Sequence, residues 1–113
     1  MNLVVFHGHG CHWMDPLLKE GFKHCFAVVD NAGYMICVDG KAGKPDVEVV
    51  CGSDYDLKGF YVKQGFTVVE VGGGLPTICP LTLSNCVGMV KSVLGIRAFS
   101  AITPYQLYRR LTR

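Results

Sequence analysis

The sequence predicts an α+β domain in which an antiparallel sheet packs against helices. Five short apolar segments are each followed by a glycine- or asparagine-containing turn, which is the pattern of strands joined by loops. Other segments open with helix-capping residues and carry apolar residues at helical spacing. The chain has 113 residues, half of them apolar, which is enough for one hydrophobic core. Residues 1–113 are therefore expected to form a single domain.

Two of the predicted strands are expected to pair as a β-hairpin. Both are rich in β-branched and aromatic residues, and turn residues at Asp30–Gly33 lie between them. A further segment contains a Val-Glu-Val alternation and is expected to join the same sheet. The predicted strands are Leu3–Phe6, His24–Asp30, Tyr34–Asp39, Asp46–Cys51 and Phe66–Val71.

Four helices are predicted from capping residues and from glycines that end them. They begin at Asp15-Pro16, at a Ser53-x-x-Asp56 capping box, at Ser84 or Asn85, and at Thr103-Pro104-x-Gln106; the first three are expected to end at Gly21, Gly65 and Gly95. Leu57, Phe60 and Tyr61 are expected to share one face of the second helix. The buried stripe of the third helix is expected to be Val87, Val90, Val93 and Leu94.

Charge and hydropathy exclude several classes of partner. The net charge of +2 is too small to indicate nucleic acid as the main partner. No segment contains the roughly 18 consecutive apolar residues that a membrane span requires. The N-terminal residues lack the basic region and long apolar core of a signal peptide, so secretion by that route is not expected.

One of the six cysteines is placed where a thiol becomes reactive. Cys86 follows a glycine-rich segment and lies in the first turn of a predicted helix, where unpaired N–H groups and the helix dipole favour a thiolate. The same N–H groups can stabilise an oxyanion. Cys25, Cys37, Cys51 and Cys79 lie in or beside apolar runs, and we interpret them as reduced core residues without disulfides.

A cysteine nucleophile needs a base, and His24 is the candidate because it opens a strand whose end can face a cleft. Asp39 is the candidate third residue. With Asn31-Ala32 as a two-residue loop, or Asp30–Gly33 as a four-residue loop, His24 would lie directly across from Asp39. A three-residue loop would turn Asp39 to the other face of the sheet.

These residues give the chain a resemblance to a known superfamily. The segment Gly21-Phe22-Lys23-His24-Cys25-Phe26 at a strand start, followed by Asn85-Cys86-Val87-Gly88 at a helix start, resembles the circularly permuted, NlpC-type branch of the papain-like hydrolases. Lecithin–retinol acyltransferase-like proteins belong to the same branch. The resemblance implies a permuted papain-like topology and a thiol mechanism without a cofactor. Ile36 stands where relatives often carry the third polar residue.

A second group of chemically capable residues lies near the N-terminus. His7, His9, Cys11 and His12 are zinc-ligand types, but glycines separate them and no second ligand pair follows at a standard spacing. We therefore predict no metal site. The segment is expected to lie beside His24, and His12, Trp13 and Asn85 are the predicted substrate-binding residues.

Two functions from different classes follow. The first is a cysteine hydrolase or acyltransferase that acts on an amide, ester or thioester, with cell-wall peptide as the substrate class that the resemblance implies. The second is a non-catalytic virion or assembly protein on a papain-like scaffold, with a virion or host protein as its partner. The segment Ile102-Thr103-Pro104-Tyr105 resembles small phage-encoded proteins, which implies the host-cell cytoplasm or the virion as its location.

Overall fold

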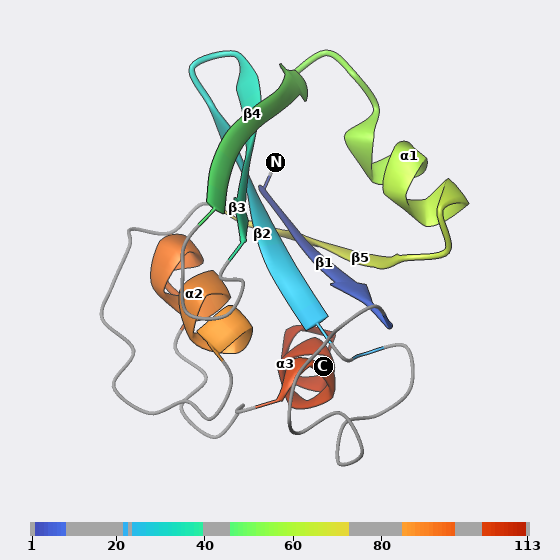
Figure 1. The fold of residues 1–113 in the computed structure, drawn as a ribbon, viewed down its shortest axis with the longest axis vertical. Coiled ribbons are helices and arrows are strands. Elements are labelled where there is room, and N and C mark those ends of the chain that lie inside the picture. Colours follow the sequence, from blue (N-terminus) through green and yellow to red (C-terminus); the bar gives the residue numbers. More distant parts are fainter. Residues whose placement is uncertain are drawn as a thin grey trace.

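Five antiparallel strands form one sheet in the computed structural model of the chain, which describes residues 2–8, 22, 24–39, 46–72, 85–96 and 103–112 (Figure 1). The strands are β1 (Asn2–His7), β2 (His24–Asn31), β3 (Tyr34–Asp39), β4 (Asp46–Gly52) and β5 (Thr67–Val71). Their order across the sheet is β4-β3-β2-β1-β5, and every neighbouring pair is antiparallel. All five predicted strands are confirmed, with ends that differ by at most one residue.

The hairpin between β2 and β3 turns one residue later than predicted. Its two loop residues are Ala32 and Gly33, because Asn31 still pairs with Tyr34. Both loop residues have positive φ, 54° and 83° respectively. This is the backbone signature of a type I′ turn, whose twist matches that of the flanking strands. Glycine adopts this conformation without strain, whereas alanine does so at a cost.

Three helices complete the described fold: α1 (Leu57–Lys63), α2 (Asn85–Leu94) and α3 (Pro104–Leu111). The cap of α3 is confirmed in full, since the Thr103 side chain accepts from the Gln106 N–H while the Gln106 side chain accepts from the Thr103 N–H. Gly95, with a φ of 66°, ends α2 as predicted, and the next N–H, that of Ile96, donates to the Lys91 carbonyl.

The start of α1 differs from the predicted capping box. Asp56 is itself the N-cap, and its carboxylate accepts from the Gly59 N–H at 3.1 Å. The Ser53 hydroxyl instead donates to the Asp30 carboxylate at 2.6 Å, and so joins this turn to β2. Phe60, which was predicted to share a face with Leu57 and Tyr61, is 43% exposed, because the short helix buries only those two residues. Gly65 has a φ of 87°, as expected of a residue that ends a helix.

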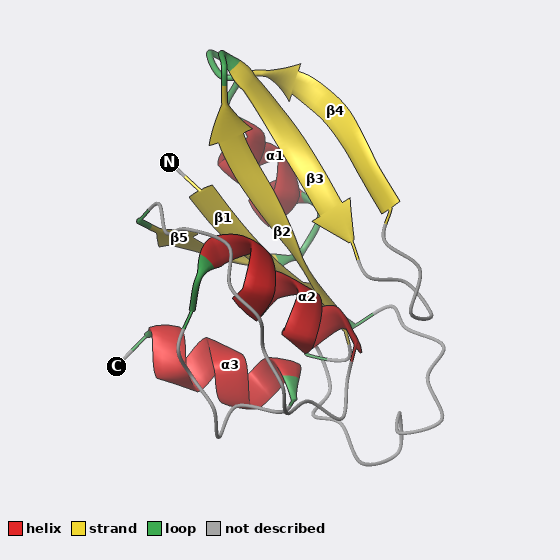
Figure 2. Cartoon of the chain, turned by 90° about the vertical axis from the view of Figure 1, so that its left-hand side faces the viewer, coloured by secondary structure: helices red, strands yellow, loops and turns green. Residues whose placement is uncertain are grey.

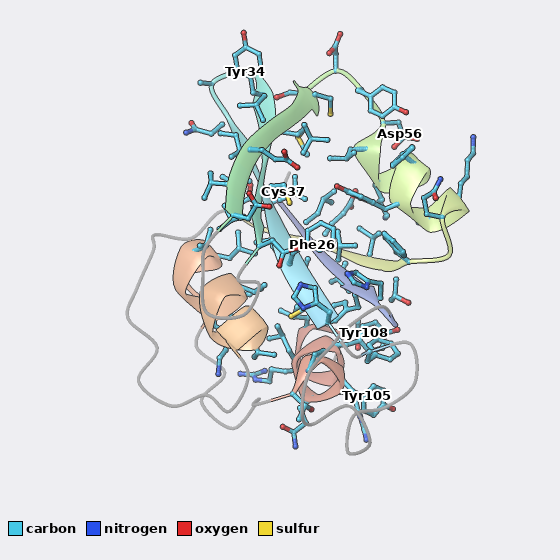
Figure 3. The ribbon with its side chains drawn as sticks, in the orientation of Figure 1. Phe26, Tyr34, Cys37, Asp56, Tyr105 and Tyr108 are labelled. Carbon is cyan, nitrogen blue, oxygen red and sulfur yellow. The ribbon has the colours of Figure 1, made fainter. Side chains whose placement is uncertain are left out.

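Both faces of the sheet are covered, and alternate residues of β1 and β2 point to different faces. In Figure 2, α2 and α3 lie on the near side of the sheet and α1 lies behind it. On the α2 side, the buried residues are Val4, Phe6, Cys25 and Ala27 with Val87, Val90, Leu94 and Leu107. On the α1 side they are Leu3, Val5, Phe26, Val28 and Met35 with Leu57 and Tyr61. Figure 3 shows Phe26 on the side of β2 that faces α1.

The chain therefore forms a compact α+β domain built on a five-stranded antiparallel sheet. No helix in the described part of the chain is long and apolar enough to cross a bilayer. The predicted helix at Asp15-Pro16 lies outside the described residues, as do His12 and Trp13.

Candidate functional site

His24 and Asp39 are joined by a short hydrogen bond at one end of the sheet. The distance between His24 Nε2 and Asp39 Oδ1 is 2.6 Å. Both side chains are largely withdrawn from solvent, with 16% and 10% of their surface exposed. A hydrogen bond between an imidazole and a carboxylate fixes the orientation of the ring, and it is stronger when the ring is charged. The predicted pairing of His24 with Asp39 is thus present in the structure.

The route by which Asp39 reaches His24 differs from the prediction. The β2–β3 ladder pairs Ala27 with Val38, so the next position places Asp39 across from Phe26 and not across from His24. Moving the loop from Asn31-Ala32 to Ala32-Gly33 shifts the pairing by two residues. A shift of two keeps each side chain on its face of the sheet, because side chains alternate with a period of two. Asp39 therefore bonds diagonally to His24, over a separation that long side chains can bridge.

His7 lies beside His24, as expected for the segment that begins at His7, although His7 was not among the predicted catalytic residues. The two histidines are directly paired between β1 and β2, and their ring centroids are 5.1 Å apart. The His7 ring also contacts Phe66 at 5.0 Å and Phe26 at 5.9 Å. The signal that could have identified His7 is its position at the end of β1, next to the glycines that end that strand. Antiparallel pairing of the first two strands then brings the two histidines together.

An aromatic surface supports these polar groups from the α1 side. Tyr61 stacks on Phe66 with centroids 5.9 Å apart, and it meets Phe26 edge-on at 5.5 Å. The pKa of the Tyr61 hydroxyl is raised to about 12, chiefly by burial and to a smaller extent by the neighbouring Cys37, Cys51, Glu48 and Asp39. Tyr61 thus stays protonated at neutral pH and acts as a neutral wall of the site.

Acidic residues continue along the same face of the sheet beyond Asp39. Asp46 is paired directly with Asp39 across the β3–β4 ladder, and Glu48 is paired with Cys37. Asp39 itself is buried, while Asp46 and Glu48 are exposed. Asp39, Asp46 and Glu48 therefore place three carboxylates on the α1 face of β3 and β4.

Cys86 is the second residue of α2, which confirms the predicted helix start at Asn85. Figures 1 and 2 both show the Asn85 end of α2 near the start of β2, the strand that His24 opens. The remainder of α2 packs on the face of Cys25 and Ala27, whereas His24 contacts His7 on the α1 face. The side chains of Asn85 and Cys86 lie outside the described part of the structure.

A buried lysine on α2 is a further residue that the sequence analysis missed. Lys91 is completely buried, one helical turn beyond Val87 on the stripe that packs against the sheet. Lysine is seldom fully buried in proteins unless it is paired. The signal was available in the spacing, because the predicted stripe of Val87, Val90 and Leu94 passes through position 91.

The described residues contain no group of three or more histidine, cysteine, aspartate and glutamate side chains arranged to hold a metal ion. His9, Cys11 and His12 are outside those residues. Cys25, Cys37 and Cys51 are not in disulfides; Cys25 is buried, and the other two are half-buried.

The chain was compared with protein-family models, with curated proteins and with solved structures, and none of the three comparisons gave a significant match.

Proposed function

We propose that the protein is a cysteine hydrolase or acyltransferase in which Cys86 is the nucleophile, His24 the base and Asp39 the residue that orients His24. The observation that carries the proposal is the 2.6 Å bond between His24 Nε2 and Asp39 Oδ1 in a largely buried position. An oriented imidazole at a strand end, near the first turn of a helix that carries a cysteine, has the composition of a thiol-activating site.

In this mechanism the carboxylate holds Nε2, so His24 Nδ1 exchanges the proton with the Cys86 thiol. The thiolate adds to the carbonyl carbon of an amide, ester or thioester, and the carbonyl oxygen becomes an oxyanion. N–H groups of the first turn of α2, which no carbonyl within the helix can satisfy, would stabilise that charge. The His24 imidazolium then donates its proton to the leaving group as the bond to carbon breaks. Water, or an acyl acceptor, releases the acyl group from Cys86 by the reverse sequence.

The two faces of the sheet constrain how the thiol reaches the imidazole. His24 is grouped with His7 and Phe26, whereas α2 packs on the other face. His24 is also the first residue of β2, so the ladder does not continue past it on that strand. In the proposed arrangement Cys86 therefore approaches His24 around the end of the sheet. The NlpC-type topology and cell-wall peptide as substrate class are parts of this same proposal and rest on the sequence resemblance.

The opposite placement of α2 and His24 also favours a competing function. If Cys86 stays on the face that α2 covers, the bond from His24 to Asp39 becomes a structural link between β2 and β3. The chain would then be a non-catalytic virion or assembly protein. The two functions differ in the chemistry of Cys86, because only the first requires an activated thiol.

Selective alkylation tests the proposal. The native protein is treated with a small excess of iodoacetamide at pH 6, and the modified cysteines are identified by peptide mass spectrometry. An activated Cys86 should react about tenfold or more faster than an ordinary exposed thiol, whose pKa is ~8.5. The matched control is the variant His24→Gln, which should bring Cys86 down to the ordinary rate. An equal rate of Cys86 modification in wild type and His24→Gln would contradict the catalytic function.

A further inference from the structure

The edge strand β4 is exposed along most of its length. Among the described strands it is the last on its side of the sheet, with β3 as its one partner. Residues 46–50 are all exposed, and Val47 and Val49 are 60% and 61% exposed. Figure 1 shows β4 at the margin of the domain, away from α3. An exposed edge strand offers unpaired backbone groups to an additional strand.

The two faces of this edge differ in chemistry. Val47 and Val49 pair with Val38 and Ile36, which point to the α2 face. Glu48 pairs with Cys37 on the α1 face. Asp46 also lies on the α1 face, because it pairs with Asp39. The exposed edge is thus apolar on one face and acidic on the other.

Apolar surface continues inward from the edge on the α2 face. Ile36, which pairs with Val49, is half-buried, and Tyr34 on the same strand is 54% exposed. Figure 3 shows Tyr34 at the hairpin end of the sheet, away from Tyr105 and Tyr108 on α3. The apolar surface of the α2 face therefore extends over both β3 and β4.

We propose that β4 binds an extended segment of a partner protein in which basic and apolar residues alternate. Strand addition supplies backbone hydrogen bonds, and alternate side chains supply specificity. Directly opposed side chains share a face, so a partner must place apolar residues beside Val47 and Val49 and basic residues beside Asp46 and Glu48. The region 46–57 carries four acidic residues and no basic residue, which strengthens the preference for a basic segment.

Charge disfavours a second copy of the chain as the occupant. Antiparallel pairing of β4 with another β4, centred on residues 46–48, would place Asp46 and Glu48 of each chain beside the acidic residues of the other. Like charges directly opposite are destabilising. The β-bulge at Met35/Ile36, where Val50 is the extra residue of β4, further interrupts a regular edge-to-edge pairing.

The test uses two capped hexapeptides, Val-Lys-Val-Lys-Val-Lys and Val-Glu-Val-Glu-Val-Glu, with two-dimensional amide NMR of the intact chain. The lysine peptide should shift amide signals of β4 and of its neighbour β3, and the glutamate peptide should not. Glu48→Lys should lower the affinity for the lysine peptide by about tenfold, as expected for reversal of a charge at a complementary interface. Val49→Thr replaces valine by a polar side chain of nearly the same size, and it should lower the affinity by a smaller factor.

Glu70→Lys is the matched control, because Glu70 is an exposed acid on β5, the strand at the opposite edge of the sheet. It makes the same change in net charge and should leave the affinity unchanged. Each of three results would overturn the proposal: equal weakening by Glu48→Lys and Glu70→Lys, equal binding of both peptides, or no β4 shifts at millimolar lysine peptide. Formation of a dimer through β4, seen by light scattering, would instead identify a second copy as the occupant.

Discussion

His24 and Asp39 are hydrogen-bonded at 2.6 Å although they are not partners in the strand ladder. The bond runs diagonally from the first residue of β2 to the last residue of β3. It closes one end of a hairpin whose other end is the Ala32-Gly33 turn. The same bond can serve catalysis, by orienting the imidazole, or stability, by joining the two strands. The first two predictions separate these roles.

Cys86→Ala should preserve the fold and abolish any acyl-transfer or hydrolytic activity. Loss of the nucleophile removes the chemistry, and replacing a thiol in a first helical turn should cost about 1 kcal/mol or less. Cys25→Ala is the matched control. Cys25 is a fully buried residue of β2 in the core that α2 covers, so its loss should cost about 1–2 kcal/mol while activity remains. Urea unfolding measures the stability of the two variants, and an ester- or amide-cleavage assay measures their activity. Equal destabilisation by both variants, with no loss of activity, would make Cys86 a structural residue.

Asp39→Ala should slow the alkylation of Cys86 at pH 6 by about tenfold, because an unoriented imidazole is a poorer base for the thiol. The rate is measured with iodoacetamide on protein that unfolding measurements show to be folded. Glu48→Ala removes an exposed carboxylate from the same face of the sheet and serves as the control. It should leave the rate nearly unchanged. A similar decrease in both variants would indicate a general effect of negative charge and not orientation of His24 by Asp39.

Tyr61 should make stability depend on pH in the alkaline range. Burial raises the pKa of Tyr61 from 10.0 to about 12. Between these values the unfolded chain loses the proton and the folded chain keeps it, so the stabilising contribution is complete below pH 10 and is lost as the pH rises toward 12. Between pH 10 and pH 12, the free energy of unfolding of wild type should therefore fall relative to that of Tyr61→Phe. Tyr34→Phe, at a position that is 54% exposed, is the comparison. Each variant's free energy of unfolding is compared with that of wild type across this pH range. If the difference varies with pH in the same way for Tyr61→Phe and Tyr34→Phe, the raised pKa of Tyr61 is refuted.

Substitutions in the β2–β3 turn should change stability in opposite directions. Ala32→Asn should stabilise the protein by about 0.5–1 kcal/mol, because asparagine tolerates the positive φ of 54° at that position better than alanine does. Gly33→Ala should destabilise it by about 1 kcal/mol. A side chain at Gly33 would meet no atom within 4 Å, so that cost is conformational and not steric. Thermal unfolding of the two single variants measures both effects, and a stabilising Gly33→Ala would contradict the turn geometry.

Local signals in the sequence determined the elements of this fold. Thr103, Pro104 and Gln106 specify the start of α3 through a capping box that depends only on neighbouring residues. Gly95 likewise ends α2 because its positive φ is a local property. The sequence also identified His24 and Asp39 as a pair, since their faces depend only on whether the loop has an even or an odd number of residues.

Tertiary structure decided what depends on contacts between distant segments. Whether Ser53 caps α1 or bonds to Asp30 depends on where β2 lies, and the choice of Asp56 as the cap follows from it. The segment that begins at His7 was expected beside His24, but the direct pairing of the two histidines depends on the register of β1 against β2. The sequence by itself thus determined the strands, the start of α3, the end of α2 and the shared face of His24 and Asp39, because these follow from local backbone chemistry. The sheet order, the diagonal bond and the face on which α2 packs were decided by the tertiary structure, because each depends on how the whole core is filled.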